Sequence, residues 1–265
     1  MPRPVPPALG AIAALLLPPL RTLVGRRWSG TRNLPRSGGF VVAANHVSNL
    51  DPVLVGDLLL THGAPPAILA KSELFARPVL AAILRAAGQV EVRRDSADAA
   101  RALDDARAAL RSGRCVLVFP EGSFTRDPDL WPMTGRTGAA RLALEAGVPL
   151  VPVVTWGGQR VLPPFTSRFR PWPRVTAEVV VGRPMTREDL LPDAPAAPEA
   201  APGAGPTPGA TPGADLTADE LAGATARIMD RLAAMLGVVR GETPPLRLWD
   251  TRVDGDPHPR RRRGR

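Results

Sequence analysis

Short apolar runs alternate with segments of helical periodicity between residues 40 and 181, and this alternation constrains the fold more than any other feature. Runs of this length and composition are typical of buried strands. Between two of them, segment 97–111 carries alanine and leucine at helical spacing, with aspartate and arginine on its other face. Strands that alternate with helices predict an α/β layered domain with a mostly parallel sheet flanked by helices. The predicted strands are 40–44, 67–70, 90–92, 115–119, 150–155 and 175–181.

His46 and Asp51 follow the first of these runs directly, within the sequence NHVSNLD. In α/β proteins, chemistry tends to lie where a strand ends. A carboxylate beside an imidazole fixes its tautomer and stabilises its protonated form, so that the imidazole can take a proton from a hydroxyl near neutral pH. No serine or cysteine nucleophile motif accompanies the pair, which favours a base that acts directly on a substrate hydroxyl. Two other interpretations stay open: an ordinary surface contact, and an N-cap role for Asp51, because Pro52 follows it.

Three further blocks follow the NHVSNLD segment in a fixed order. They are KSELF at 71–75, followed by GQVEVRR at 88–94; VLVFPEGS at 116–123; and the apolar VPLVPV at 148–153. In order and spacing, residues 25–185 resemble the glycerolipid acyltransferases, the family of 1-acylglycerol-3-phosphate acyltransferase. The resemblance implies an acyltransferase-like α/β domain, with His46 as general base and Asp51 as its orienting partner.

The resemblance also implies residues that bind the acyl acceptor. Glu121 and Gly122 lie in the FPEG block, which the family assigns to acceptor binding, and we expect Glu121 to accept a hydrogen bond from the acceptor's glycerol hydroxyl. Arg94 aligns with the family's phosphate-binding arginine, although a solvated strand end is the alternative. Lys71 opens its block and is the one lysine of the chain, which suggests a role that arginine does not fill.

The sequence departs from the family after the FPEG block. Many relatives read FPEGTR, whereas this chain reads FPEGSFTR, so the arginine is displaced by two positions to Arg126. Arg136 stands two residues before Gly138, where relatives often have lysine, and is a second candidate cation. Arg126 and Arg136 are therefore candidate substrate-binding residues whose reach to the phosphate the sequence leaves open.

The predicted reaction moves a fatty acyl group from acyl-CoA or acyl carrier protein, as co-substrate, to lysophosphatidic acid, and gives phosphatidic acid. No cofactor and no metal are expected. A close variant uses another lysophospholipid or a specialised lipid as acceptor. The other classes are a membrane-surface lipid-binding protein without catalysis, and a thioesterase or phospholipase that uses the same histidine, which the absence of a GxSxG motif disfavours.

The net charge of +9 comes almost entirely from arginine. Such a charge suits anionic partners such as a phospholipid surface, a phosphate-bearing substrate or an acyl carrier. Nucleic acid is not expected as a partner, because the chain shows no recognisable binding module and its aromatic content is 4%. Cys115 lies in an apolar run and predicts neither a disulfide nor a metal cluster.

The predicted organisation has five parts. Residues 1–29 form an apolar and basic membrane-associating segment, too short to span a bilayer, although a helix packed on the protein's own core is the alternative. Residues 30–190 form the acyltransferase domain, and 191–215 a linker rich in Pro, Ala and Gly. Residues 216–240 form an amphipathic helix that docks on the domain or on the membrane, and 241–265 a basic disordered tail. The expected location is the cytoplasmic face of the cell membrane, in a peripheral or monotopic arrangement.

Overall fold

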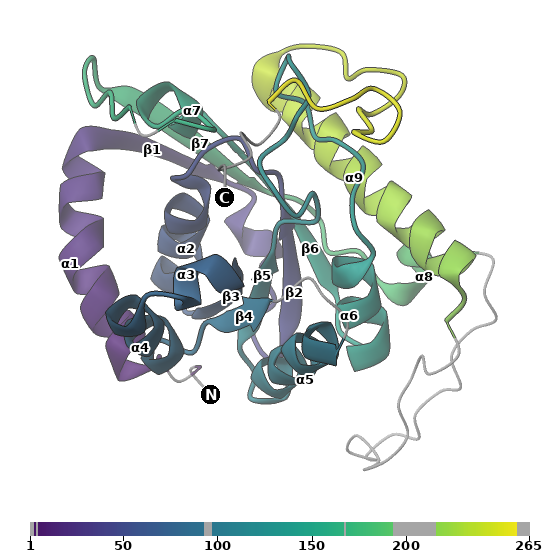
Figure 1. Ribbon diagram of the computed structural model, residues 1–265, viewed down its shortest axis with the longest axis horizontal. Coiled ribbons are helices and arrows are strands. Elements are labelled where there is room, and N and C mark those ends of the chain that lie inside the picture. The colour runs from purple at the N-terminus through teal and green to yellow at the C-terminus, as the bar shows by residue number, and fades with distance from the viewer. Residues whose placement is uncertain (1–2, 4, 93–96, 167, 193–215, 259–265) are drawn as a thin grey trace, which may run out of the picture.

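One mostly parallel sheet forms the centre of the molecule (Figure 1). The computed structural model describes residues 3, 5–92, 97–166, 168–192 and 216–258. Within these residues the sheet has seven strands in the order β1-β7-β6-β2-β5-β3-β4, and every neighbouring pair is parallel except β6 with β7. The predicted α/β fold with a mostly parallel sheet is therefore confirmed. The strands are β1 Val24–Ser29, β2 Phe40–Ala44, β3 Pro66–Lys71, β4 Val90–Val92, β5 Cys115–Val118, β6 Leu150–Trp156 and β7 Val175–Val181.

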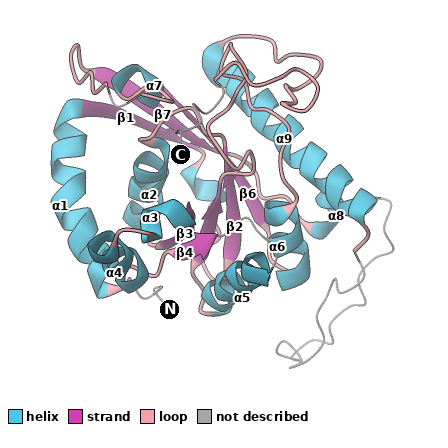
Figure 2. Cartoon of the chain, in the orientation of Figure 1, coloured by secondary structure: helices cyan, strands magenta, loops and turns pink. Residues whose placement is uncertain are grey.

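Helices cover both faces of the sheet (Figure 2). The side chains of β2 show why two layers form: Phe40 and Val42 belong to the core beneath α2, whereas Val41 and Ala43 belong to the core beneath α5, α6 and α9. All four are fully buried, as a central strand between two helical layers requires. The helices are α1 Pro7–Leu23, α2 Asp51–Thr61, α3 Ser72–Phe75, α4 Pro78–Ala86, α5 Ala97–Arg111, α6 Gly138–Ala146, α7 Gly158–Val161, α8 Arg187–Leu190 and α9 Ala218–Arg240, with a 3-10 turn at Thr31–Asn33.

The first strand of the sheet was not predicted. Val24–Ser29 pairs with β7 in parallel and forms an edge of the sheet, so the predicted boundary at residue 30 is wrong: the sheet begins at Val24. The sequence hid this strand because its Arg26 and Arg27 interrupt the apolar pattern, which an edge strand with an exposed side tolerates. Before it, α1 makes a 17-residue helix. No helix within the described residues has the length and apolarity needed to span a membrane.

The C-terminal helix α9 has the predicted start and the predicted apolar stripe. Thr217 caps it, and the Glu220 side chain accepts a hydrogen bond from the Thr217 backbone in return, which completes a capping box. Its stripe, which includes Ile228 and Leu232, is buried in the same core as α5 and α6. The helix therefore packs on the domain, the first of the two interpretations that the sequence allowed.

A pair of substitutions in α9 measures this packing. Leu232 is fully buried and Val238 is 84% exposed on the same helix. We expect Leu232→Ala to lower the free energy of unfolding by about 2–5 kcal/mol, because it leaves a cavity, and Val238→Ala to change it by less than about 0.5 kcal/mol. Urea denaturation followed by circular dichroism checks both. Equal, small effects at the two positions would contradict the packing of α9 in the core.

The segment after α9 was predicted to be disordered from residue 241, and this is wrong as far as residue 258. Residues 241–258 form turns that return over the domain, where Trp249 makes a β-bridge with Met133 and accepts a hydrogen bond from the Thr134 N–H at 2.8 Å. Contacts with distant parts of the chain, which the charged composition of this segment does not reveal, hold it on the domain. Most of the predicted linker (193–215) and residues 259–265 lie outside the described residues.

Candidate active site

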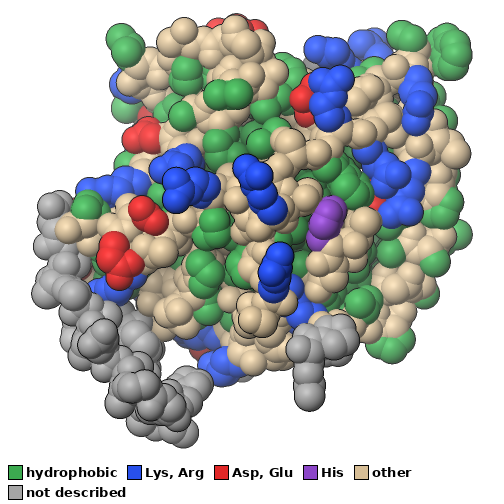
Figure 3. Space-filling view, turned by 180° about the vertical axis from the view of Figure 1, so that it is seen from behind, with side chains coloured by type: hydrophobic (Ala, Val, Ile, Leu, Met, Phe, Trp, Pro, Cys, Tyr) green, Lys and Arg blue, Asp and Glu red, His purple; other side chains and the backbone are tan. Residues whose placement is uncertain are grey.

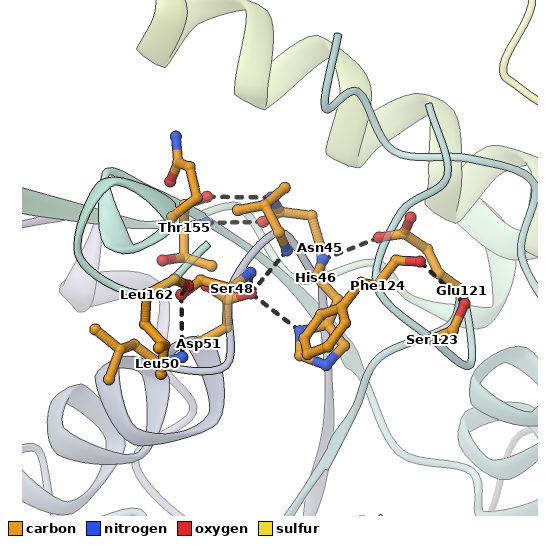
Figure 4. Close-up of polar contacts among 12 residues, drawn as sticks. Asn45, His46, Ser48, Leu50, Asp51, Glu121, Ser123, Phe124, Thr155 and Leu162 are labelled. Atoms are coloured by element: carbon orange, nitrogen blue, oxygen red, sulfur yellow. Dashed lines mark hydrogen bonds and ion pairs between the residues drawn. The ribbon is translucent and has the colours of Figure 1, made fainter. Parts of the chain in front are cut away.

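The candidate base lies in the loop that leaves the central strand β2 (Figure 4). Asn45, the first residue after β2, fixes this loop to the neighbouring strand β6: its amide donates to the Thr155 carbonyl at 3.1 Å and accepts from the Thr155 N–H at 2.8 Å. Ser48 donates from its hydroxyl to the Leu162 carbonyl at 2.8 Å. Asn45 and Ser48 therefore position the His46 loop, because they tie it to β6 and to the segment that follows β6.

The buried carboxylate of Asp51 binds the backbone of this loop. Its Oδ2 accepts the backbone N–H groups of Val47 and Ser48, each at 2.7 Å, and lies 3.0 Å from Nδ1 of His46. The carboxylate is fully buried, and burial raises its pKa, opposed by the contact with His46 and by the two N–H groups. Asp51 is the first residue of α2, and no side-chain hydrogen bond caps this helix. The carboxylate therefore orients the histidine and its loop instead of acting as the N-cap.

The imidazole of His46 lies between two aromatic rings. Its centroid is 4.2 Å from that of Phe119 and 4.3 Å from that of Phe124, and its side chain keeps 13% exposure. Because an ionised carboxylate only accepts hydrogen bonds, the contact with Asp51 places the proton on Nδ1 and leaves Nε2 as the acceptor. This is the arrangement that a base needs to take a proton from a hydroxyl.

Glu121 contacts the His46 loop through its carboxyl group. Its Oε1 accepts the backbone N–H of His46 at 2.9 Å, and its Oε2 accepts that of Met133 at 3.2 Å. Both oxygens therefore serve the protein's own backbone, and the carboxyl links the His46 loop to the segment after the FPEG block. Burial raises its pKa from 4.5 to about 8. At neutral pH it is mainly protonated, so it braces the loop without a second negative charge beside Asp51.

The raised pKa of Glu121 predicts a specific dependence of stability on pH. Between pH 4.5 and about 8 the carboxyl is protonated in the folded protein and ionised in the unfolded chain, so stability falls as the pH rises through this window. The full effect is at most about 5 kcal/mol. We expect Glu121→Gln to remove this part of the slope, measured by urea denaturation between pH 5 and pH 8. The same slope in both proteins would show that Glu121 does not titrate in this window.

The structure separates the predicted cations. Arg136 is exposed and passes over Gly122, whose φ is +70°: a Cβ built on this glycine would lie 2.8 Å from the Arg136 Nε. The backbone conformation of this residue favours glycine. Arg126 lies elsewhere and is occupied by the C-terminal segment. Lys71 ends β3, and its side chain, like all of Arg94, lies outside the described residues.

Arg126 is bound by residues that the sequence did not associate with the site. Its guanidinium donates to the His258 carbonyl at 2.8 Å, lies 3.3 Å from the Asp256 carboxylate and covers the Phe165 ring at 4.3 Å. Phe165 contacts Phe124, which contacts His46, so rings connect this arginine to the candidate base. No sequence signal pairs positions this far apart. Phe119 belongs to an apolar run and Phe124 to the departure from the family pattern, so the sequence did not show that both rings contact His46.

Comparisons with known proteins identify relatives of the region that contains this site. Residues 25–156 match the family model named Acyltransferase. Through this region, the chain belongs to the acyltransferase family. The crystal structure of the 1-acyl-sn-glycerophosphate (LPA) acyltransferase PlsC from Thermotoga maritima aligns with a TM-score of 0.61 and 21% identity, over 89% of this chain and 81% of that one. The two proteins share a fold.

Curated relatives carry two kinds of name. A 1-acyl-sn-glycerol-3-phosphate acyltransferase from Borreliella burgdorferi is 30% identical over 129 residues, which are 48% of this chain and 50% of the relative. A lyso-ornithine lipid O-acyltransferase from Pseudomonas aeruginosa is 39% identical over 110 residues, which are 42% and 40%. The human 1-acyl-sn-glycerol-3-phosphate acyltransferase alpha is 30% identical over 186 residues, which are 69% and 63%. The matched region spans half or less of the first two relatives and under two thirds of the third.

Proposed function

We propose that this protein transfers a fatty acyl group from acyl-CoA or acyl carrier protein to the free hydroxyl of 1-acylglycerol-3-phosphate and forms phosphatidic acid. The observation that carries the proposal is the contact between His46 Nδ1 and Asp51 Oδ2 at 3.0 Å, in a family of acyltransferases. This contact leaves Nε2 unprotonated. The names of the Borreliella and human relatives support the acceptor.

In the proposed reaction, Nε2 of His46 removes the proton of the acceptor hydroxyl as its oxygen attacks the thioester carbonyl carbon. The C–O bond forms and the carbonyl oxygen becomes an oxyanion. When this intermediate collapses, the C–S bond breaks, and the thiolate takes the proton that the imidazolium holds. Asp51 stabilises the imidazolium between these two steps.

Binding of the acceptor phosphate needs fixed cations near the base. Arg136 is the described candidate, because it is exposed and passes over Gly122, the residue after Glu121. Lys71 and Arg94 remain candidates from the sequence. Arg126 can bind the phosphate only if its contacts with Asp256 and His258 are broken. We place the enzyme at the cytoplasmic surface of the cell membrane, with α1 in contact with lipid, since its substrate and product are lipids and α1 exposes Leu15 and Leu16.

A second acceptor is favoured by one observation: the relative from Pseudomonas aeruginosa, at 39% identity, is named for lyso-ornithine lipid. Both acceptors present a hydroxyl to the same base but differ in the headgroup. The test incubates the purified protein with acyl-CoA, or acyl carrier protein, and an equimolar mixture of lysophosphatidic acid, lyso-ornithine lipid and lysophosphatidylcholine, and identifies the products by mass. Phosphatidic acid as the main product supports the proposal. Acylated ornithine lipid as the main product moves the assignment to that acceptor, and free fatty acid alone would show a hydrolase.

A further inference from the structure

A hollow lined by arginine lies at the outer edge of the sheet, away from His46. The hollow is open to solvent and has a volume of about 330 Å³; it is lined by Arg21 at the end of α1, Arg26 and Trp28 on β1, and Arg174 just before β7. Arg174 donates to the backbone carbonyl of Arg21 at 3.3 Å, which joins the loop before β7 to the end of α1. The end of α1 and the strand β1 that follows it thus meet the distant loop before β7, and their guanidinium groups lie together.

The charge in this hollow is only partly balanced. Asp57, on α2, is buried, with 1% of its side chain exposed; its Oδ1 accepts from Arg21 at 2.5 Å and its Oδ2 from Arg26 at 3.0 Å. Among the described residues, no acidic side chain forms an ion pair with Arg174. One carboxylate therefore faces three guanidinium groups, and two positive charges remain.

The guanidinium groups are also held in place. The buried Asp57 carboxylate accepts hydrogen bonds from Arg21 and Arg26. The guanidinium group of Arg26 also stacks on the Trp28 ring, with 4.9 Å between the guanidinium carbon and the ring centroid. Arginine groups that are fixed before a ligand arrives bind phosphate oxygens with less loss of side-chain entropy. Figure 3 shows one face of the molecule, on which basic side chains are more prominent than acidic ones.

Exposed apolar side chains lie in the segments that build the hollow. In the loop before β7, Trp172 is 85% exposed and Phe169 is 52% exposed. In α1, Leu15 is 74% exposed, and Leu23, two residues after Arg21, is also exposed. Large side chains that are exposed together around cations are typical of a surface that enters the headgroup layer of a membrane. A nucleic acid or a free anion does not require these apolar groups.

The directions of the strands place the hollow at the end of the sheet where the His46 loop also lies. β2 runs parallel to β6, β6 runs antiparallel to β7, and β1 runs parallel to β7. The first residues of β1 and β7 therefore lie at the edge where β2 ends and the His46 loop begins. Figure 1 shows α1, β1 and β7 together on one side of the molecule. A membrane bound at this surface faces the edge that carries the candidate base.

We propose that the hollow binds the phosphate of an anionic phospholipid at the membrane surface, while Trp172 and Phe169 enter the headgroup layer. This is a second lipid site, separate from the acyl-transfer site, and it binds a lipid that is not consumed. The proposal does not depend on the identity of the acyl acceptor.

The test measures flotation of the full chain, without acyl donor, on vesicles of phosphatidylcholine alone and of equal parts phosphatidylcholine and phosphatidylglycerol. Arg174→Gln is the informative variant, because loss of Arg21 or Arg26 would leave Asp57 buried with a missing partner. The control is Arg231→Gln, which removes an equally exposed arginine from α9, on the other face of the sheet. Trp172→Ala tests the aromatic contact independently.

We expect the wild type to bind the anionic vesicles, Arg174→Gln to bind them about fivefold more weakly, and Arg231→Gln to bind like the wild type. Trp172→Ala should also weaken binding. Equal losses in the two arginine variants would show attraction by overall charge and would overturn the site. Release of the wild type by a few millimolar inorganic phosphate, at constant ionic strength, would show that free phosphate competes with the lipid phosphate for the hollow, as the proposal expects. Because no turnover is measured, failure here leaves the proposed reaction untouched.

Discussion

Replacement of His46 by alanine is expected to lower the acyl-transfer rate by about 10²–10⁴-fold, the usual contribution of a positioned general base. The physical reason is that no other described group takes the hydroxyl proton: Asp51 is fully buried and bound by two N–H groups. The fold should survive, because the His46 backbone N–H still donates to Glu121. The measurement is steady-state acylation of lysophosphatidic acid in detergent micelles, with circular dichroism as the check on folding.

His62→Ala is the matched control for this loss. His62 is exposed at the end of α2, and we expect its replacement to leave the rate in micelles unchanged. A folded His46→Ala protein that retains more than about a tenth of the wild-type rate would contradict the assignment of His46 as the base.

Asp51→Asn is expected to have the second-largest effect, a loss of at least about 10²-fold in kcat. One asparagine oxygen can still accept from Val47, Ser48 and His46, so the loop and the tautomer can persist. What disappears is the negative charge that stabilises the imidazolium during the reaction. The measurement is kcat together with the melting temperature of the variant.

Comparison with Asp51→Ala separates the effect of the negative charge from the effect of the hydrogen bonds that hold the loop. The alanine variant also removes the acceptor of two backbone N–H groups, so it should lower stability in addition to kcat, by roughly 1–3 kcal/mol for each donor left buried without a partner. A well-folded Asp51→Asn protein with a nearly normal kcat would show that the carboxylate only holds the loop.

Structure and site are predicted best from the sequence where strands are fully buried or where interacting residues are close in sequence. β2, β5 and β6 are buried almost entirely, so their apolar runs are recognisable in the sequence. His46 and Asp51 are close in sequence and meet across one turn. The start of α9 at Thr217 was equally visible, because a capping box is a local pattern.

The sequence fails where a role depends on contacts between distant residues. The sequence does not show that Glu121 accepts from the backbone N–H groups of His46 and Met133, because these residues come together only in the folded chain. Arg126 was a candidate for phosphate binding, and it is occupied by residues 256–258, which were expected to be disordered. Composition describes the average surroundings of a residue, whereas these roles depend on one specific partner.

Acyl transfer with His46 as the base is tested most directly by thiol release from acyl-CoA, and from acyl carrier protein, with and without 1-acylglycerol-3-phosphate, for the wild type and His46→Ala. We expect release that depends on the acceptor, formation of phosphatidic acid in equal amount, and loss of both in the variant. Release that proceeds equally without acceptor, or that persists in His46→Ala, would contradict an acyl transfer in which His46 is the base.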